Sequence, residues 1–291
     1  MTRHPLRLAV LEAERELAAA GVPSPRVDAE LLAAHVVDVP RGRLVMVPLV
    51  DEPVLGRYQD LVARRAAREP LQHILGAAVF GPVTLAVGPG VFTPRPETEL
   101  LLDWGLKAIA DVASPLVVDL CTGSGALALG IAAGRPDAVV HAVEADATAL
   151  SWARRNVEAH AGAGGAPVVL HAADVRRPDL LPELETHVDL VLCNPPYVPD
   201  GTPVPPEVAA FDPPGAVFGG PDGLEIIRAV VTAAAALLRH GGRLGIEHDD
   251  THADAVPDLL RRRRVLADVE EHRDLAGRPR FATARRAAVS V

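Results

Sequence analysis

The sequence predicts an α/β protein whose larger part is a doubly wound, mostly parallel sheet. Two observations indicate this fold. From Leu116 onward, short apolar strand patterns alternate with helical patterns, and a glycine-rich turn at 121–125 separates the first of these strands from its helix. Near the N-terminus the hydrophobic periodicity is helical instead. We therefore expect a small all-α domain ahead of the sheet.

Composition narrows the class of protein. A length of 291 residues suggests two domains, and 49% hydrophobic residues without a membrane-spanning run predict a soluble protein with no membrane contact. No signal peptide is apparent, and two cysteines cannot form a disulfide framework. We therefore expect a reducing, cytoplasmic location. The net charge of −9 argues against direct nucleic-acid binding.

Residues 1–75 are expected to form the helical N-terminal domain. One helix carries an apolar face from Leu6 to Leu17, a second begins at Ser24-Pro25, and a third covers about 53–68. The segment shows no catalytic constellation. Its expected role is therefore substrate recognition and positioning, and we expect the protein to be a monomer.

A hairpin linker is predicted at 76–95, because alternating apolar residues there are interrupted by Gly-Pro turns. The sheet domain is predicted at 96–291, with a first helix that starts at Pro96 and has Glu97 and Glu99 in its first turn. Its strands are expected at 116–120, 138–143, 167–172, 188–193 and 243–247, with an antiparallel pair at 265–271 and 281–285. Its later helices are expected at 126–133, 148–160 and 224–238. The Pro/Gly-rich segment 199–221 is expected to be a substrate-facing loop.

The fourth strand runs into the stiff polar corner Asn194-Pro195-Pro196-Tyr197. Neither proline has a backbone N–H, so the strand must stop there. The side-chain oxygen of Asn194 and the carbonyl of Pro195 can together accept both hydrogens of an N–H₂ group. Tyr197 can supply a flat face for a planar amide or base. An Asn-Pro corner alone is also compatible with a simple turn after a core strand.

The first strand of the sheet ends in a turn suited to a nucleoside cofactor. Glycines between Asp119 and Ala126 let a ligand approach the backbone at a helix N-terminus. Glu144 follows Gly123 by 21 residues, which fits an acceptor for ribose hydroxyls. Asp174 follows the third strand and can accept from an adenine amino group. The glycine pattern also matches a dinucleotide fingerprint, so this half alone does not identify the cofactor.

These motifs resemble the Rossmann-like class I methyltransferases that use S-adenosyl-L-methionine. The Asn-Pro-Pro-Tyr corner is shared there by amino-group DNA methyltransferases and protein glutamine methyltransferases. Further stretches are similar to the release-factor glutamine N5-methyltransferases, and the resemblance covers nearly the whole chain. They are EPLQHILG at 69–76, FTPRPETELLLDWGL at 92–106, DPPGAVFGGPDGLEIIRA at 212–229 and RDLAGRPRFATAR at 273–285.

The resemblance implies methylation of the glutamine in the Gly-Gly-Gln motif of class 1 peptide chain release factors. It implies that the methionine part of the cofactor is lined by Cys121, Thr122, Gly123, Ser124 and Gly125. Glu144 would bind the ribose, and Asp174 and Val175 would lie by the adenine. The glutamine amide would be held by Asn194, Pro195, Pro196 and Tyr197, with Asn194 also beside the cofactor.

The sequence departs from the family pattern in places. Glu144 stands where Asp is usual, Val175 stands where some members carry an aromatic residue, and His73 replaces a common Tyr. The stretch Ile246 to Asp250 also differs from the usual sequence after the fifth strand. These differences concern fine specificity rather than the chemistry.

Three functions are weighed for the site. The first is the release-factor methyltransferase, and the second is an N-methyltransferase acting on another protein glutamine or on a nucleic-acid base. The third is a nicotinamide enzyme or a non-enzymatic cofactor-binding module, against which the intact Asn-Pro-Pro-Tyr corner counts. Phe92 and Arg95 are candidates to line the site or simply precede a helix. No metal site is expected, since His141, His171 and His248 lack ligand-like spacing.

Overall fold

The computed structural model describes residues 3–288. Contacts between residues divide the chain into two compact units. The first unit takes in the chain up to Ala77 together with Val204–Phe211, and the second takes in Ala78–Pro203 together with the chain from Asp212 on. The domain boundaries expected from the sequence, after residues 75 and 95, remain predictions.

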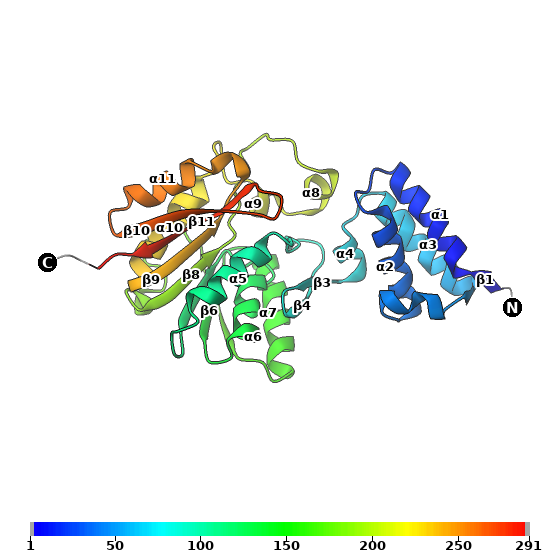
Figure 1. Ribbon diagram of the computed structural model, residues 1–291, viewed down its shortest axis with the longest axis horizontal. Coiled ribbons are helices and arrows are strands. Elements are labelled where there is room, and N and C mark those ends of the chain that lie inside the picture. Colours follow the sequence, from blue (N-terminus) through cyan, green and yellow to red (C-terminus); the bar gives the residue numbers. More distant parts are fainter. Residues whose placement is uncertain (1–2, 289–291) are drawn as a thin grey trace. The chain divides into compact units, whose positions relative to one another are not determined.

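The first unit is mainly helical (Figure 1). Its elements are α1 (Leu6–Ala19), α2 (Pro25–Val37), the 3₁₀ helix η1 (Arg41–Met46), α3 (Glu52–Ala66), α4 (Leu71–Leu75) and α8 (Pro206–Phe211). Apolar faces of α1, α2, α3 and α4 share one core, with Leu17 and Leu32 fully buried. Tyr58 closes this core, and its hydroxyl donates to the carbonyl of Ala29 at 3.0 Å. Two short strands, β1 (Arg3–Pro5) and β2 (Leu49–Asp51), pair antiparallel. The sequence predicted an all-α unit, and this strand pair corrects that prediction.

Helix α8 is a correction to the predicted loop at 199–221, which also contains α9 (Pro214–Val217). Glu207 of α8 binds two arginines of the first unit: Arg68 at 2.6 Å and Arg65 at 3.1 Å. Arg65 is itself buried and pairs with Asp28 at 2.8 Å. These ion pairs explain why a segment that follows the Asn-Pro-Pro-Tyr corner packs with the helical unit.

The second unit contains, within residues 3–288, one seven-stranded sheet in the order β10-β11-β9-β8-β5-β6-β7 (Figure 1). The parallel strands are β5 (Leu116–Leu120), β6 (Val139–Glu144), β7 (Val168–Ala172), β8 (Val188–Cys193) and β9 (Leu238–Glu247). The antiparallel pair is β10 (Leu266–Arg273) and β11 (Pro279–Arg286). A Rossmann-like methyltransferase sheet with an antiparallel C-terminal pair was expected, and the structure confirms it.

Helices cover both faces of this sheet. One apolar core joins α5 (Thr98–Ala108), α6 (Ala126–Gly134) and α7 (Ala147–Gly162) to the sheet and to the hairpin β3 (Ala77–Phe80) and β4 (Val83–Ala86). The other core joins α10 (Glu225–Leu237) and α11 (Ala255–Arg262) to the opposite face. The strands β5 and β8 contribute to both cores, which explains their unbroken apolar runs. Helix α5 starts at Thr98, two residues after the expected Pro96.

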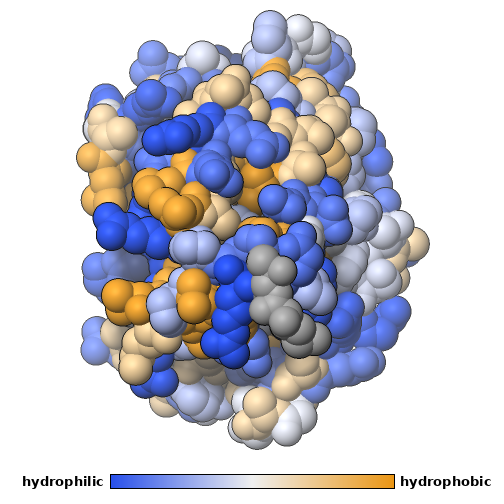
Figure 2. Space-filling model, turned by 90° about the vertical axis from the view of Figure 1, so that its right-hand side faces the viewer, coloured by the Kyte–Doolittle hydropathy of each residue, from blue (hydrophilic) through white to orange (hydrophobic). Residues whose placement is uncertain are grey.

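The surface shows no large apolar face in the view of Figure 2, where hydrophobic residues lie in small groups between hydrophilic ones. Large exposed hydrophobic side chains of the first unit include Leu8, Val45, Met46 and Leu49. Between residues 3 and 288, no helix has the length and apolar character needed to cross a membrane.

Candidate functional site

The predicted site residues gather at one edge of the sheet. The glycine-rich turn follows β5, Glu144 ends β6, and Asn194 follows β8. These three strands are neighbours in the parallel part of the sheet. Asp174 lies two residues beyond the end of β7, the outer strand. The carboxyl edge of a parallel sheet is where ligands of this fold class bind.

The glycine-rich turn adopts a backbone that needs its glycines. Gly123 and Gly125 have φ of 57° and 88°, in the left-handed region. Cys121 is also left-handed, at φ 59°, which is a strained conformation for a residue with a side chain. A Cβ atom added to Gly123 would meet nothing within 4 Å. The backbone of the turn therefore borders open space.

Glu144 is tied to this turn. Its carboxylate accepts the backbone N–H of Gly123 at 2.8 Å and that of Asp146 at 2.9 Å. Burial raises the pKa of Glu144, while these backbone donors oppose the rise. Each carboxylate oxygen can still accept a further hydrogen bond, as a ribose acceptor must. The side chain of Glu144 is longer than that of Asp, so its carboxylate reaches the turn and can still accept hydrogen bonds from a ligand.

Asp174 and Val175, which follow β7, are both engaged with other parts of the protein. The carboxylate of Asp174 forms an ion pair with Arg176 at 2.7 Å, and this hydrogen bonding lowers the pKa of Asp174. Val175 is buried, and its side chain belongs to the apolar core that also contains Val143 and Leu180. Its side chain is thus unavailable for stacking, so only its backbone can face a ligand.

Asn194 is half-buried, and the two prolines after it are buried. The side-chain Nδ2–H of Asn194 donates to Thr98 Oγ1 at 3.2 Å. Among residues 3–288, no group donates to Asn194 Oδ1. The nitrogen end of this amide is therefore held by the protein, and the oxygen end is the one left to accept.

The backbone of the corner is supported from one side by two glycines. A Cβ on Gly219 would lie 2.6 Å from the carbonyl oxygen of Pro196. A Cβ on Gly223 would lie closer still to the carbonyl oxygen of Tyr197. Backbone hydrogen bonds of 2.9–3.0 Å also join Val198 to the segment that contains Gly219. The close approach explains why the stretch after α9 is rich in glycine.

Two residues of the site were not singled out from the sequence: Thr98 and Glu247. Glu247 is the last residue of β9 and is 1% exposed. It accepts a hydrogen bond from the Tyr197 hydroxyl at 3.1 Å. A signal existed in the sequence, because an acid at the end of an apolar strand beside β8 is unusual. For Thr98, a single hydroxyl at a helix start, no pattern could have indicated the contact.

Phe92 and Arg95 precede α5. The Arg95 guanidinium lies 4.9 Å from the centre of the Phe92 ring and pairs with Asp212 at 2.6 Å. Asp212 is buried, and it follows α8 directly. Arg95 therefore anchors one end of the segment that follows the Asn-Pro-Pro-Tyr corner.

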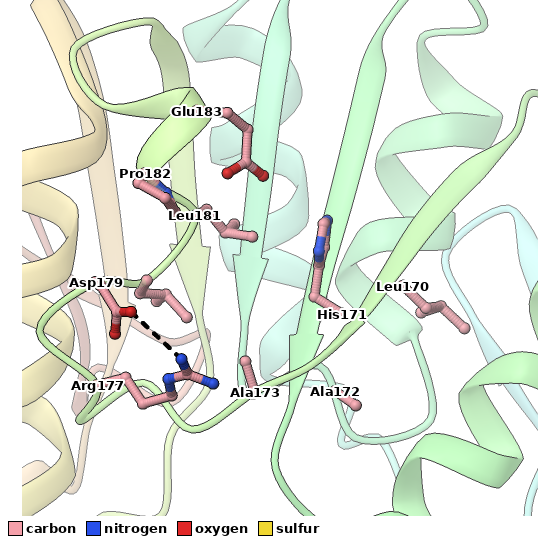
Figure 3. Close-up of a pocket in the computed structure, with 10 residues that line it drawn as sticks. Leu170, His171, Ala172, Ala173, Arg177, Asp179, Leu181, Pro182 and Glu183 are labelled. Atoms are coloured by element: carbon pink, nitrogen blue, oxygen red, sulfur yellow. Dashed lines mark hydrogen bonds and ion pairs between the residues drawn. The ribbon is translucent and has the colours of Figure 1, made fainter.

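A separate hollow of about 350 Å³ lies beside β7 and contains none of the predicted site residues (Figure 3). His171 lines it, and the His171 ring stacks on that of His141, with 2.9 Å between two ring nitrogens. Burial lowers the pKa of both rings. Within residues 3–288, no cluster of His, Cys, Asp or Glu side chains is arranged to hold a metal ion.

Comparisons with known proteins agree with this geometry. Residues 9–76 match the PrmC N-terminal domain family, and residues 83–208 match the methyltransferase small domain family. The chain is 53% identical over 290 residues to a release factor glutamine methyltransferase of Mycolicibacterium smegmatis, covering 100% of both chains. It is 50% identical over 285 residues to one of Mycobacterium tuberculosis, covering 97% of this chain and 91% of the relative.

Among solved structures, the catalytic domain of hMettl16 in complex with an RNA hairpin superposes with a TM-score of 0.53. The match covers 84% of this chain and 86% of that one, at 15% sequence identity. At this level of identity the likeness concerns the fold alone.

Proposed function

The chain belongs to the release factor glutamine methyltransferases, and on that premise we propose that it methylates the side-chain amide nitrogen N5 of a release-factor glutamine. The methyl donor is S-adenosyl-L-methionine, and the target is the glutamine of the Gly-Gly-Gln motif in class 1 peptide chain release factors. The orientation of Asn194 carries the proposal. With Nδ2 bound to Thr98, its oxygen is left to accept from a substrate N–H.

The residues around the turn fit the cofactor. Open space above Gly123 and the N-terminus of α6 suit a charged, extended methionine group. Glu144 has the acceptor capacity for ribose hydroxyls. The methionine part is assigned to Cys121, Thr122, Gly123, Ser124 and Gly125, and the adenine to Asp174 and the backbone of Val175. Since Asp174 pairs with Arg176, adenine binding there shares the carboxylate with that arginine.

The chemistry is a methyl transfer from sulfur to nitrogen. The cofactor supplies an electrophilic methyl group on a sulfonium. The amide nitrogen is a weak nucleophile, because its lone pair is delocalised into the carbonyl. Asn194 Oδ1 and the Pro195 carbonyl each accept one N–H, which aims the lone pair and favours the positive charge that develops on nitrogen. Such orientation lowers a barrier by up to roughly 7–11 kcal/mol.

The new C–N bond forms as the S–C bond breaks, and the nitrogen then loses one proton. The methylated nitrogen is strongly acidic at that moment, so the proton passes to water without a dedicated base. The face of Tyr197 is assigned to the planar amide. Its hydroxyl is bound to Glu247 and is not assigned to proton transfer.

We further assign release-factor recognition to the helical first unit. The net charge of −9 favours a protein partner over direct contact with nucleic acid. We also propose that the protein is a monomer and that it works in the cytoplasm, where release factors act.

The test is peptide mass spectrometry of a purified class 1 release factor incubated with this protein and S-adenosylmethionine. One added methyl, on the Gly-Gly-Gln glutamine, is the expected result. A release factor with that glutamine changed to glutamate is the matched control and should stay unmodified. Transfer to another glutamine, or to a base of added RNA or DNA, would contradict the substrate assignment.

A further inference from the structure

We propose that Asn156 is a positioning residue of the cofactor site, which holds the glycine-rich turn in the shape that binds S-adenosylmethionine. The inference rests on the proposed function, because it concerns the cofactor site assigned there. Asn156 lies on α7, and its side chain is buried. Helix α7 packs beside β4 and follows the strand β6, which ends in Glu144 (Figure 1).

The side-chain amide of Asn156 is bound to backbone groups on two sides. Its Nδ2 donates to the Ser124 carbonyl at 2.9 Å and to the Ala86 carbonyl at 3.0 Å. Its Oδ1 accepts the Ala86 N–H at 2.7 Å. Both amide hydrogens and one acceptor position are therefore used. A single buried side chain thus joins the glycine-rich turn to the last residue of β4.

The contact with Ser124 fixes one peptide unit of the turn at both ends. The Ser124 carbonyl is held by Asn156, and the N–H of the same peptide, on Gly125, donates to the Thr122 carbonyl at 2.9 Å. A peptide that precedes a glycine rotates easily, because glycine accepts both signs of φ. Gly125 has φ of 88°. With Asn156 removed, only the bond to Thr122 would oppose a rotation of this peptide.

The fixed peptide stands directly before α6. Gly125 is the N-cap of α6, and its carbonyl accepts the Leu129 N–H at 2.9 Å. The direction of the Ser124–Gly125 peptide therefore sets where the helix N-terminus begins. The turn and this N-terminus are the groups assigned to the methionine part of the cofactor. A turn that is held before the cofactor arrives binds it more tightly, because binding then loses less conformational entropy.

Asn156 also belongs to a stripe of α7 that packs on the segment after β4. Thr148, Trp152 and Asn156 are spaced four residues apart and so share one face of the helix. Trp152 Nε1 donates to the Pro89 carbonyl at 3.2 Å, and a Cβ added to Gly90 would lie 2.6 Å from Thr148. Among these three described side chains, Asn156 is the one that also binds the turn. Anchoring the segment and holding the turn can therefore be tested separately.

Asn156→Asp changes the amide into a carboxylate of the same shape. The oxygen that replaces Nδ2 faces two carbonyl oxygens and has no hydrogen to donate in neutral buffer, so the bond to Ser124 is lost. We expect the Kd for S-adenosylmethionine, measured by calorimetry, to rise about 10- to 50-fold. In a methylation assay the KM for the cofactor should rise equally, with kcat at saturating cofactor within about threefold of wild type. This split indicates an effect on cofactor binding rather than on the chemical step.

Two control variants separate this role from a general loss of stability. Tyr58→Phe removes another buried hydrogen bond to a backbone carbonyl, that of Ala29, in the first unit. Trp152→Phe weakens the same stripe of α7 and leaves the bond to Ser124 in place. Both should bind S-adenosylmethionine with a Kd within about threefold of wild type. A Kd raised as far in Trp152→Phe as in Asn156→Asp would overturn the inference, because anchoring of the segment would then explain the effect.

Wild-type protein provides a second test, which decides the matter if Asn156→Asp does not fold. Coupling is reciprocal, so a cofactor that binds the held turn must also stabilise the Asn156 contact. The chain has only two asparagines, Asn156 and Asn194, so labelling with ¹⁵N-asparagine gives a simple NMR spectrum. On addition of S-adenosylmethionine, the side-chain N–H₂ of Asn156 should exchange with water about tenfold more slowly. The backbone N–H of Asn156, inside α7, is the internal control and should slow less.

A Kd for Asn156→Asp within about threefold of wild type, or an Asn156 side-chain exchange that the cofactor does not slow, would show the inference to be wrong. If wild-type protein binds S-adenosylmethionine but methylates no release factor, the proposed function is wrong instead. Calorimetry and hydrogen exchange still decide the role of Asn156 in that case, since both use the cofactor alone. Wild-type protein that does not bind S-adenosylmethionine would contradict both.

Discussion

Asn194 donates its side-chain N–H to Thr98 Oγ1 across 3.2 Å, although the two residues are 96 positions apart in the chain. The contact joins the corner after β8 to the first turn of α5. An asparagine free to rotate presents its donor or its acceptor to a ligand with similar ease. Bound to Thr98, it presents the acceptor, which is the end that a glutamine amide requires.

The glycine contact behind the corner gives a first prediction. Gly219→Ala should lower both kcat and the free energy of unfolding, the latter by about 1–3 kcal/mol, because the new Cβ lies 2.6 Å from the Pro196 carbonyl. Gly215→Ala is the matched control, since a Cβ there meets nothing within 4 Å. Urea unfolding and steady-state rates would measure both. Equal behaviour of the two variants would mean that the corner is not held by this contact.

Removal of Glu207 tests how the segment after the corner is held. Glu207→Ala removes ion pairs with Arg65 and Arg68 and should cost about 2–4 kcal/mol of unfolding free energy, since Arg65 is buried. Proteolysis within 199–221 should become faster. Glu225→Ala, which breaks an exposed pair with Arg176, should change little. Proteolysis at the wild-type rate in Glu207→Ala would contradict this account of the segment.

The stability of the protein should depend on pH through Asp119. Burial raises the pKa of Asp119 to about 7, against the hydrogen bonds from Thr122 and Ala128. In the unfolded chain an aspartate titrates near a pKa of about 4. Between these values the folded state keeps a proton that the unfolded state has lost. Stability should therefore fall as pH rises through this window, by up to about 1.4 kcal/mol per pH unit.

Asp119→Asn should flatten the curve in that range when unfolding is measured from pH 4 to 8. Asp137→Asn is the comparison, because Arg135 and the Ser114 N–H lower the pKa of Asp137 to about 2. The ionised Asp137 carboxylate stops stabilising the fold only at more acidic pH. The curve of stability against pH for Asp137→Asn should therefore run parallel to that of wild type between pH 4 and 8. A wild-type stability that is constant over the window would refute the role given to Asp119.

Tyrosine ionisation gives a further check, because the chain has only two tyrosines, Tyr58 and Tyr197. Burial raises the pKa of both, and the charge of Glu247 raises that of Tyr197 further. Absorbance at 295 nm should therefore show no phenolate at pH 10, near which a free tyrosine titrates. Stability should fall above that pH, since the unfolded chain loses protons that the folded chain retains. In Glu247→Gln, Tyr197 alone should titrate at lower pH.

Much of the architecture could be predicted from the sequence. Apolar runs that alternate with helical patterns predicted the strands of the sheet. An Asn directly after a buried strand indicated the Asn-Pro-Pro-Tyr corner. These signals are local, and each follows from periodicity or from the backbone limits of Pro and Gly. The pairing of β1 with β2 and the helix α8 were missed, because each is very short and depends on tertiary partners such as Arg65.

The interior of the site could be predicted less well. No pattern in the chain indicated that Glu144 binds the backbone of Gly123, or that Arg176 forms an ion pair with Asp174. Thr98 belongs to a stretch that resembles the family, yet its contact with Asn194 depends on how α5 packs on the sheet. Such contacts between residues far apart in the chain are set by packing, which no local pattern encodes.

The most direct test of the account is the Asn194→Ala variant. We expect methylation of the release factor to fall at least about 100-fold, the usual cost of losing a hydrogen bond that stabilises a transition state. S-adenosylmethionine should bind with a Kd within about threefold of wild type by calorimetry, since the glycine-rich turn and Glu144 are unchanged. Turnover near the wild-type rate would contradict the role of Asn194 as the acceptor that holds the substrate amide.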